Sequence, residues 1–284
     1  MTLPVTFAEV VAVDRITPRT ARVTFEAEAL ADTVGTTPDQ QLKLCFPRPG
    51  RRRPVLPVQQ GDPMGWYQAY LAIPEAERPP LRSFTLRRRH PGTRRIEIDF
   101  VLHGDAGPAA AWALRAAPGD VLGLVGPSAL YAPPVPFAEA AAEADWVLLA
   151  GDETALPAMA TLLEALSEGV RAYAWIEVED RAERQELRGR AELEVRWLHR
   201  DGAPPGSVLT GAFRGGVLPG GRPFVWLAGE AGAVRAVRRC LVEEHGVSKE
   251  GIDFTGYWRH RLTQDDAPTA EDLADAQERL AASS

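Results

Sequence analysis

The stretch DWVLLAGDETALPAMATLLEAL, residues 145–166, decides the fold of the second half of the chain. Its first residues, Asp145–Ala150, form an apolar run of strand length, and apolar residues at helical spacing follow over Thr154–Leu166. A turn that begins with Gly151 separates the two segments. A strand that leads through a short turn into a helix is the repeating unit of a parallel sheet with crossover helices.

The same alternation continues to the end of the chain. Strands are expected at Val170–Glu177, Leu193–Leu198, Pro223–Ala228 and Gly251–Tyr257, with helical stretches at Arg181–Leu187 and Gly232–His245. Residues 268–282, rich in Ala and Glu, predict a C-terminal helix whose role the sequence does not show. The second half is therefore expected to be an α/β domain built on a parallel sheet.

The first half has the pattern of a small antiparallel sheet or barrel. Residues 5–25 alternate β-branched and polar side chains around a turn at Thr17-Pro18, which is typical of a hairpin. Helix signals are nearly absent before residue 108, and the Pro-rich, polar segment Pro47–Pro80 predicts a long surface excursion between strands. The further strands are expected at Gln41–Phe46, Ser83–Arg88, Arg95–Leu102 and Val121–Val125.

The change of pattern after the Pro-rich run Tyr131–Pro136 predicts a domain boundary. A chain of 284 residues exceeds one average domain and falls short of three. We expect a β domain over residues 1–131, a linker over 132–140, and an α/β domain with the C-terminal helix over 141–284.

Composition excludes several classes of protein. With 45% hydrophobic and 25% charged residues the chain is of the globular type, and no apolar run approaches the roughly 18 to 20 residues that span a bilayer. The N-terminus lacks a secretory signal, which predicts a cytoplasmic protein without a membrane span. Cys45 and Cys240, the two cysteines, lie far apart and provide no disulfide framework or Cys-rich metal site.

The charge is distributed unevenly along the chain. The net charge of −7 argues against a nucleic-acid partner. Residues 1–130 carry a net charge of +3 and the remainder −10. The positive charge is either a solvated surface or a field that recruits an anionic cofactor or substrate. Much of it lies in two clusters, Arg48/Arg51/Arg52/Arg53 and Arg82/Arg87/Arg88/Arg89/Arg94/Arg95.

A first candidate site lies in the segment Leu81–Arg87. On a strand, Arg82 and Phe84 share one face and Thr85 faces the other. A guanidinium and a hydroxyl can hold a phosphate, and an aromatic ring can lie against a flavin. An ordinary strand would also account for these three residues.

A second candidate site lies in Asp99–Ala113. A strand ends at Leu102, a glycine-bearing turn follows, and a helix begins at Gly107-Pro108 with its free N–H groups directed at the turn. Such a helix start suits a pyrophosphate. His103, just before the turn, is either a structural histidine or a ligand contact.

Two further candidates lie at strand ends of the α/β half. The turn Gly151–Ala158 follows the first strand, where ligands of open parallel sheets bind. Its polar residues could equally cap the next helix. Gly256–Arg259 ends the last strand, and its aromatic residues could instead close a core. There is no G-x-G-x-x-G fingerprint, which disfavours a standard Rossmann dehydrogenase.

These four stretches, in this order, resemble the siderophore-interacting protein family, flavin-dependent ferric-chelate reductases related to the ferredoxin-reductase superfamily. The similarity runs from residue 5 to about 261. The family's Arg-x-Tyr-Thr-x-Arg is matched by Arg82–Arg87, with Phe84 in place of Tyr, which keeps ring stacking and loses a phenol hydrogen bond. The family's long Asp-Phe-Val-Leu-His-Gly motif is met in full over Asp99–Ala113, and the other two stretches are intact.

The resemblance implies an N-terminal antiparallel β-barrel that binds FAD non-covalently and a C-terminal α/β domain that binds NADH or NADPH. A basic rim of Lys43, Arg48 and Arg259 is our hypothesis for contact with an anionic ferric siderophore. No catalytic residue and no metal ligand is expected from the chain, because a flavin carries the redox chemistry. The implied cofactor-binding residues are Arg82, Ser83, Phe84, Thr85, Asp99, Val101, His103, Gly107, Pro108, Ala109, Trp112, Gly151, Asp152, Glu153, Thr154 and Trp258.

The implied reaction is reduction of chelated Fe(III) to Fe(II) with electrons from NAD(P)H. Two alternatives stay open: a flavin reductase that passes electrons to ferredoxin or free flavin, and a non-redox siderophore carrier. Reduced ferredoxin is also an alternative donor. Glu177, Glu179 and Asp180 follow a strand of the α/β half, where acidic groups would repel a 2′-phosphate and favour NADH, unless they only face solvent.

Overall fold

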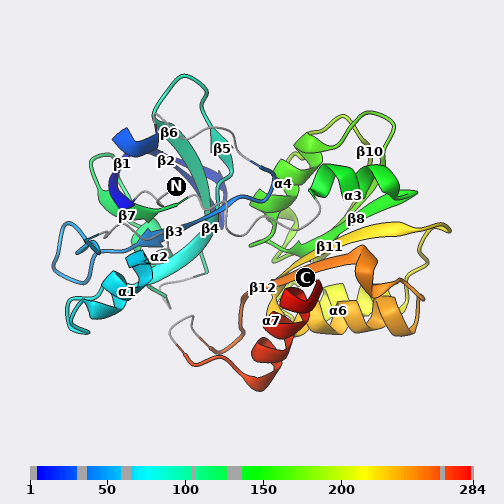
Figure 1. The fold of residues 1–284 in the computed structure, drawn as a ribbon. Coiled ribbons are helices and arrows are strands. Elements are labelled where there is room, and N and C mark those ends of the chain that lie inside the picture. Colours follow the sequence, from blue (N-terminus) through cyan, green and yellow to red (C-terminus); the bar gives the residue numbers. More distant parts are fainter. Residues whose placement is uncertain are drawn as a thin grey trace. The chain divides into compact units, whose positions relative to one another are not determined.

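The computed structural model describes residues 5–30, 37–58, 65–103, 107–126, 136–262 and 266–282. The chain divides into two units, Met1–Tyr131 and Ala132–Ser284 (Figure 1). The first is built on an antiparallel sheet and the second on a parallel sheet, so the expected fold class is confirmed. Every helix within the described ranges is too short or too polar to cross a lipid bilayer.

The antiparallel sheet of the first unit has the strand order β4-β3-β7-β1-β2-β6-β5. The predicted hairpin is present as the first two strands, which pair around the turn after Thr17. The strands are β1 (Val5–Thr17), β2 (Thr20–Glu26), β3 (Gln41–Cys45), β4 (Leu81–Thr85), β5 (Arg88–Arg89), β6 (Arg95–Val101) and β7 (Val121–Val125), with a 3-10 turn η1 (Glu28–Leu30) after β2.

The sheet curls into a barrel because its two end strands are joined by a very short connection. β4 and β5 lie at opposite ends of the strand order, yet only Leu86 and Arg87 separate them in the sequence. Two residues bridge at most roughly 11 Å, so the two edges must meet. In this connection the Leu86 backbone N–H donates to the Gln40 carbonyl beside β3 at 2.8 Å, and the Arg87 N–H donates to the Glu97 carbonyl on β6 at 3.0 Å, so consecutive residues bond to the two ends of the sheet. The interior is filled by side chains such as Phe25, Leu44 and Phe100.

The excursion predicted over Pro47–Pro80 is wrong in one respect, because it contains helix α1 (Gly65–Ala72). Trp66 and Tyr70, four residues apart on one helix face, are buried against Cys45 and Val125 on the outer side of the barrel. The Tyr70 hydroxyl donates to the Pro79 carbonyl at 2.9 Å. Two aromatic residues among prolines give too short a pattern to predict this helix.

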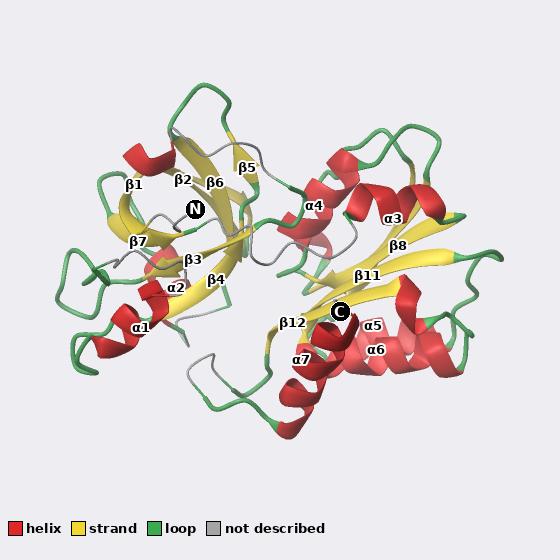
Figure 2. Cartoon of the chain, in the orientation of Figure 1, coloured by secondary structure: helices red, strands yellow, loops and turns green. Residues whose placement is uncertain are grey.

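The parallel sheet of the second unit has the order β10-β9-β8-β11-β12, with all pairs parallel. Helices α3 and α4 cover one face, and α5, α6 and α7 lie on the other (Figure 2). The strands are β8 (Trp146–Asp152), β9 (Arg171–Val178), β10 (Glu192–His199), β11 (Pro223–Glu230) and β12 (Ile252–Trp258). The helices are α3 (Phe137–Glu143), α4 (Leu156–Ala165), α5 (Ser207–Arg214), α6 (Ala231–Glu243) and α7 (Ala270–Ala282), with 3-10 turns η3 (Arg181–Glu183) and η4 (Lys249–Gly251).

Three predictions for this unit differ from the structure. The linker predicted over 132–140 contains the start of α3, and its residues 132–135 lie outside the described residues. The helical stretch predicted over Arg181–Leu187 is only the turn η3. Helix α5 has no counterpart among the predicted elements.

Helix α5 begins on a buried carboxylate from another part of the chain. Glu177 at the end of β9 is fully buried and accepts the backbone N–H groups of Gly206 at 2.6 Å and Leu209 at 2.7 Å. A carboxylate that accepts the free N–H groups of a first turn stabilises a helix. This cap lies about 30 residues before the helix, which explains why local sequence patterns do not reveal it.

Replacement of Glu177 by Ala should therefore destabilise the second unit. It removes two hydrogen bonds to backbone N–H groups and one partner of the buried Arg200, whose Nη1 lies 3.4 Å from the carboxylate. We expect a loss of about 2 to 4 kcal/mol in the free energy of unfolding, measured by urea denaturation. Glu186→Ala is the control, because Glu186 is exposed and its ion-pair partner Arg188 is exposed as well. Equal stability of the two variants would contradict the assigned role of Glu177.

Candidate functional site

The β4 motif places its residues on two faces of the barrel wall. The Phe84 ring is half-buried and packs toward the interior, 4.6 Å from the Phe100 ring. Ser83 on the other face accepts a 2.9 Å hydrogen bond from Lys43 Nζ, which lies opposite it on β3. Arg82 and Thr85 are 9% and 7% exposed. Burial lowers the pKa of Lys43.

An aromatic cluster joins the two predicted FAD motifs. The Phe100 ring on β6 lies 4.6 Å from Phe84 and 5.5 Å from Trp112 of helix α2 (Pro108–Ala113). Trp112 is 3% exposed and also stacks on Phe25, with 6.1 Å between the ring centroids. The structure therefore places Trp112 in the barrel core, where it holds α2 against the wall.

Asp99, another predicted contact, is held by an arginine that the sequence analysis missed. Arg22 on β2 lies opposite Asp99 on β6 and donates two hydrogen bonds to its carboxylate, at 2.7 and 2.8 Å. Such a two-point pair fixes both side chains. Val101, the next residue on the same strand face, is half-buried at the strand end.

The start of α2 carries no side-chain cap from Gly107. Gly107 precedes the helix in an extended conformation without a side-chain cap, and Pro108 occupies the first turn. The N–H groups of a first helical turn, here beginning with Ala109, have no partner within the helix itself and are the groups that an anion binds. His103, just before the turn, is exposed. The intervening residues 104–106 of the predicted anion-binding turn lie outside the described residues.

The donor set of the first unit fits FAD. Arg82 provides a buried cation and Thr85 a buried hydroxyl on the seam of the barrel. Phe84 provides a partly accessible aromatic ring, and the start of α2 provides N–H groups. These are the groups that a pyrophosphate and a flavin ring require.

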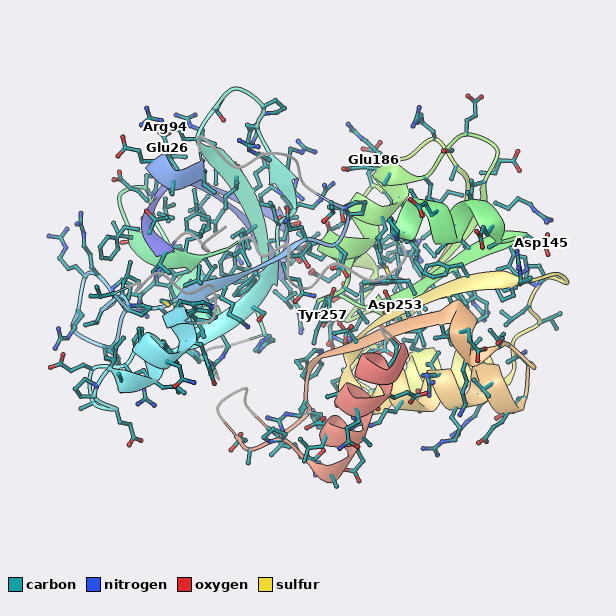
Figure 3. The ribbon with its side chains drawn as sticks, viewed as in Figure 1. Glu26, Arg94, Asp145, Glu186, Asp253 and Tyr257 are labelled. Carbon is teal, nitrogen blue, oxygen red and sulfur yellow. The ribbon has the colours of Figure 1, made fainter. Side chains whose placement is uncertain are left out.

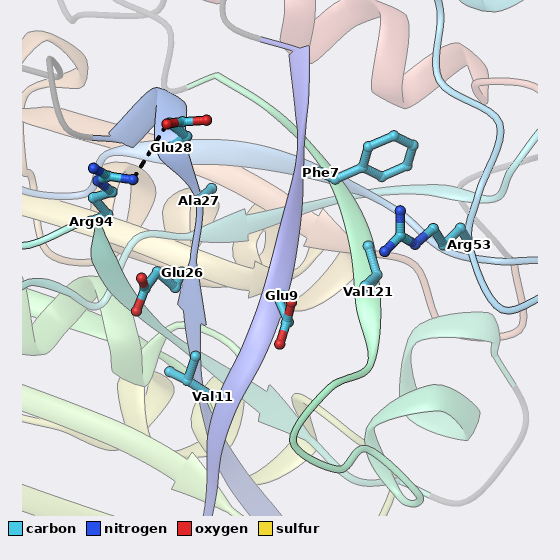
Figure 4. A pocket seen from close by; sticks show the side chains of 9 residues that line it. All are labelled: Phe7, Glu9, Val11, Glu26, Ala27, Glu28, Arg53, Arg94 and Val121. Atoms are coloured by element: carbon cyan, nitrogen blue, oxygen red, sulfur yellow. Dashed lines mark hydrogen bonds and ion pairs between the residues drawn. The ribbon is translucent and has the colours of Figure 1, made fainter.

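A separate hollow of about 330 Å³ lies on the outer side of the barrel (Figure 4). It contains none of the predicted site residues, and Arg94 at its rim pairs with Glu28 at 3.5 Å. Three carboxylates in its lining make it unsuitable for a pyrophosphate. Its lining residues are Phe7, Glu9, Val11, Glu26, Ala27, Glu28, Arg53, Arg94 and Val121.

The second candidate site lies at the point where the parallel sheet reverses its direction of winding. From β8 the chain adds β9 and β10 on one side, and then β11 and β12 on the other. The crevice outside the carboxyl ends of β8 and β11 is therefore the ligand-binding position expected for an open α/β sheet. Gly151 is required there, because a Cβ atom would lie 2.1 Å from the Ala228 carbonyl oxygen.

Asp152 is the last residue of β8, at this carboxyl edge of the sheet. Its Oδ2 accepts the Glu230 backbone N–H at 2.7 Å and the Trp258 Nε1–H at 2.8 Å, while Oδ1 accepts the backbone N–H of Thr154 at 2.9 Å and its hydroxyl. Burial and the neighbouring charge of Glu153 raise the pKa of Asp152 to about 6. The structure thus brings together the predicted residues Asp152, Thr154 and Trp258.

Glu153 belongs to a buried charge network instead. Arg200, another residue that the sequence analysis missed, donates to both Glu153 carboxylate oxygens, at 2.5 and 2.6 Å, and to Glu179 at 3.2 Å. Glu177 caps α5, and Asp180 accepts the Ala182 N–H of turn η3. These acidic groups therefore bind other groups of the protein. The expectation that they face either a 2′-phosphate or solvent is wrong for Glu177, which is fully buried.

The three cations of the hypothesised rim all have partners within their own units. Lys43 donates to Ser83, and Arg48 donates to the carbonyls of Arg78 and Glu75. Arg259 donates to the carbonyls of Asp266 and Ala267 and pairs with Asp272 of α7 at 3.0 Å. Helix α7 is also held by Arg235 and Arg238 of α6, which pair with Asp272, Asp275 and Glu278. Within the described part of the chain, no cluster of three or more His, Cys, Asp and Glu side chains could hold a metal ion.

Comparison with known proteins covers both units. The model of the siderophore-interacting FAD-binding domain matches residues 9–131, and that of the siderophore-interacting protein matches residues 144–261. The chain is 32% identical to the ferric vibriobactin reductase ViuB of Vibrio cholerae, over 84% of this chain and 83% of the relative. It is 28% identical to the NADPH-dependent ferric-chelate reductase of Escherichia coli, over 88% and 91%.

A siderophore utilization protein from T. fusca has a similar crystal structure, with a TM-score of 0.78, 38% identity and coverage of 94% of this chain and 97% of that chain. The resemblance that the four motifs predicted is confirmed. The chain belongs to the siderophore-interacting protein family and carries that family's FAD-binding domain in its first unit.

Proposed function

We propose that this protein is a ferric-siderophore reductase that binds FAD in its first unit and receives electrons from NAD(P)H through its second. The observation that carries the proposal is the match of both units to relatives named as ferric-chelate reductases over more than four fifths of the chain. The substrate is Fe(III) held by a siderophore. Each NAD(P)H oxidised supplies two electrons, which reduce two Fe(III) to two Fe(II), and one proton is released.

The residues of the first unit bind and orient the cofactor. Arg82 and Thr85 are the groups that we assign to the FAD phosphates, with the N–H groups at the start of α2. Phe84 supports the flavin ring, and its packing on Phe100 fixes the orientation of its own ring. A bound flavin supplies the conversion of hydride transfer into single-electron transfer.

The residues of the second unit receive the dinucleotide at the carboxyl edge of its sheet. The crevice beside Gly151 and Asp152 is the position that the strand order favours. A relative that uses NADPH supports NADPH as one donor. NADH and reduced ferredoxin are the other donors to be compared.

The proposal is tested by anaerobic titration of the purified flavoprotein with NADH, NADPH and reduced ferredoxin. The reduced protein is then mixed with ferric siderophores in the presence of an Fe(II) trap. We expect bleaching of the flavin bands by a nicotinamide donor and two trapped Fe(II) per NAD(P)H. Turnover with oxidised ferredoxin or free flavin but not with ferric chelates would contradict the proposal, as would a protein without flavin bands.

Replacement of Arg82 by Ala should weaken FAD binding. Loss of a charge-assisted hydrogen bond to a phosphate costs roughly 1.5 to 3 kcal/mol, or about ten- to one-hundred-and-fifty-fold in Kd. Fluorescence titration of the apoprotein with FAD measures the change. Arg94→Ala is the matched control, because Arg94 lies on the same unit and forms an ion pair with exposed Glu28. An Arg82 variant that is purified with full flavin content would remove this residue from the site.

Lys43 offers a direct test of the basic rim, because its ammonium donates to a side-chain hydroxyl, that of Ser83. Lys43→Gln should raise KM for an anionic ferric chelate about three- to tenfold at low salt. The effect should fade by about 0.5 M salt, where the charge is screened, and FAD content should not change. Lys249→Gln is the control, since Lys249 is the chain's other lysine and lies exposed in η4. An unaltered KM at low salt would exclude Lys43 from the rim.

A further inference from the structure

We propose that Asp152 is a positioning residue for the nicotinamide donor: its carboxylate fixes the ends of β8, β11 and β12 and the Trp258 indole in the arrangement that receives the dinucleotide. The inference deepens the proposed function, because it assumes that the carboxyl edge of this sheet is the donor site. Asp152 itself acts through the groups that it holds.

The geometry makes one carboxylate the common acceptor for three strand ends. Asp152 closes β8, and its Oδ2 accepts from Glu230 at the end of β11 and from Trp258 at the end of β12. Its Oδ1 holds the turn that leads into α4 through the N–H and hydroxyl of Thr154. The carboxylate is therefore surrounded by four donors and is 2% exposed.

The backbone around the carboxylate is shaped to admit it. Gly229 has φ +136°, a conformation that other residues rarely adopt, and a Cβ atom there would lie 2.6 Å from Asp152 Oδ2. Glu230 in turn fixes two other segments, because its carboxylate accepts the backbone N–H of Ala233 at 2.8 Å and that of His260 at 3.1 Å. The start of α6 and the segment after β12 are thus placed relative to Asp152.

The arrangement requires the ionised form of the carboxylate. An ionised carboxylate only accepts hydrogen bonds, whereas a protonated one must donate one and would face a donor. With its pKa raised to about 6 by burial and by Glu153, Asp152 is charged at neutral pH and becomes protonated in mild acid. Donor binding should therefore weaken as the pH falls through 6. The ionisable groups on the elements around this carboxylate include Glu153 with its partner Arg200, Glu177 on β9, Glu230 on β11 and His260 beyond β12.

Asp145 provides a matched control on the same strand pair. Its Oδ2 accepts the backbone N–H of Arg222 at 2.6 Å, where β8 and β11 begin, just as Asp152 accepts that of Glu230 where they end. Figure 3 shows Asp145 at the end of the sheet opposite to Tyr257, which precedes Trp258. Asp145→Asn therefore makes the same chemical change away from the ligand edge.

The experiment compares Asp152→Asn, Trp258→Phe and Asp145→Asn as FAD-loaded proteins. Calorimetry gives Kd for NAD⁺ and NADP⁺, and steady-state kinetics gives KM for NADH and NADPH, both between pH 5 and 8. At pH 8 we expect Asp152→Asn to raise Kd and KM about tenfold and Trp258→Phe about threefold. The Asp145→Asn protein should have the Kd and KM of the wild type. The FAD content should match the wild type in all three variants. The weakening of Kd below pH 6 should be present in the wild type and in Asp145→Asn and absent in Asp152→Asn.

An Asp152→Asn protein with wild-type Kd and KM, or with the wild-type pH dependence, would overturn the inference. A purely structural role would lower the unfolding temperature without changing the pH profile of donor binding. Wild-type protein whose flavin has been reduced by light is mixed with ferric chelate as a separate arm. If this reduced protein forms no Fe(II), the result contradicts the proposed function. The role of Asp152 is decided separately, by the Kd and KM of the variants.

Discussion

Two buried carboxylates at the ends of neighbouring strands organise the carboxyl edge of the parallel sheet in the second unit. Asp152 on β8 and Glu177 on β9 are partners in the strand register, and each accepts backbone N–H groups from segments far along the chain. A buried charge is tolerated only where such donors surround it. The ends of β11 and β12 and the start of α5 are therefore placed by these two side chains.

The first unit depends on a different constraint, the closure of a seven-stranded sheet by a two-residue connection. That closure brings the Arg82–Thr85 motif beside the strand that carries Asp99 and Phe100. The Phe84, Phe100 and Trp112 rings then join the two motifs through the barrel interior. The β4 motif and the β6–α2 motif are close because their aromatic rings share one core. Packing in that core therefore holds the side chains that suit a flavin.

The elements that were predicted wrongly or missed are short segments, for which the local pattern does not decide the structure. Strands and long helices have a local period of apolar residues, and the sequence predicts their bounds to within a few residues. Helix α1 is too short for a clear period, and α5 is capped by Glu177 from a distant strand. The segment Arg181–Leu187 has helical composition, but only Arg181–Glu183 forms a 3-10 turn, capped by Asp180.

The sequence by itself determined the fold class, the order of the strands and of the longer helices, and the family, because these follow from periodicity and from motifs that are local in the chain. Only the tertiary structure decided what the charged residues contact. Arg22 pairs with Asp99 across 77 residues, Arg200 with Glu153 across 47, and Trp258 with Asp152 across 106. Strand register and sheet order create such pairs, and neither is written in any one segment.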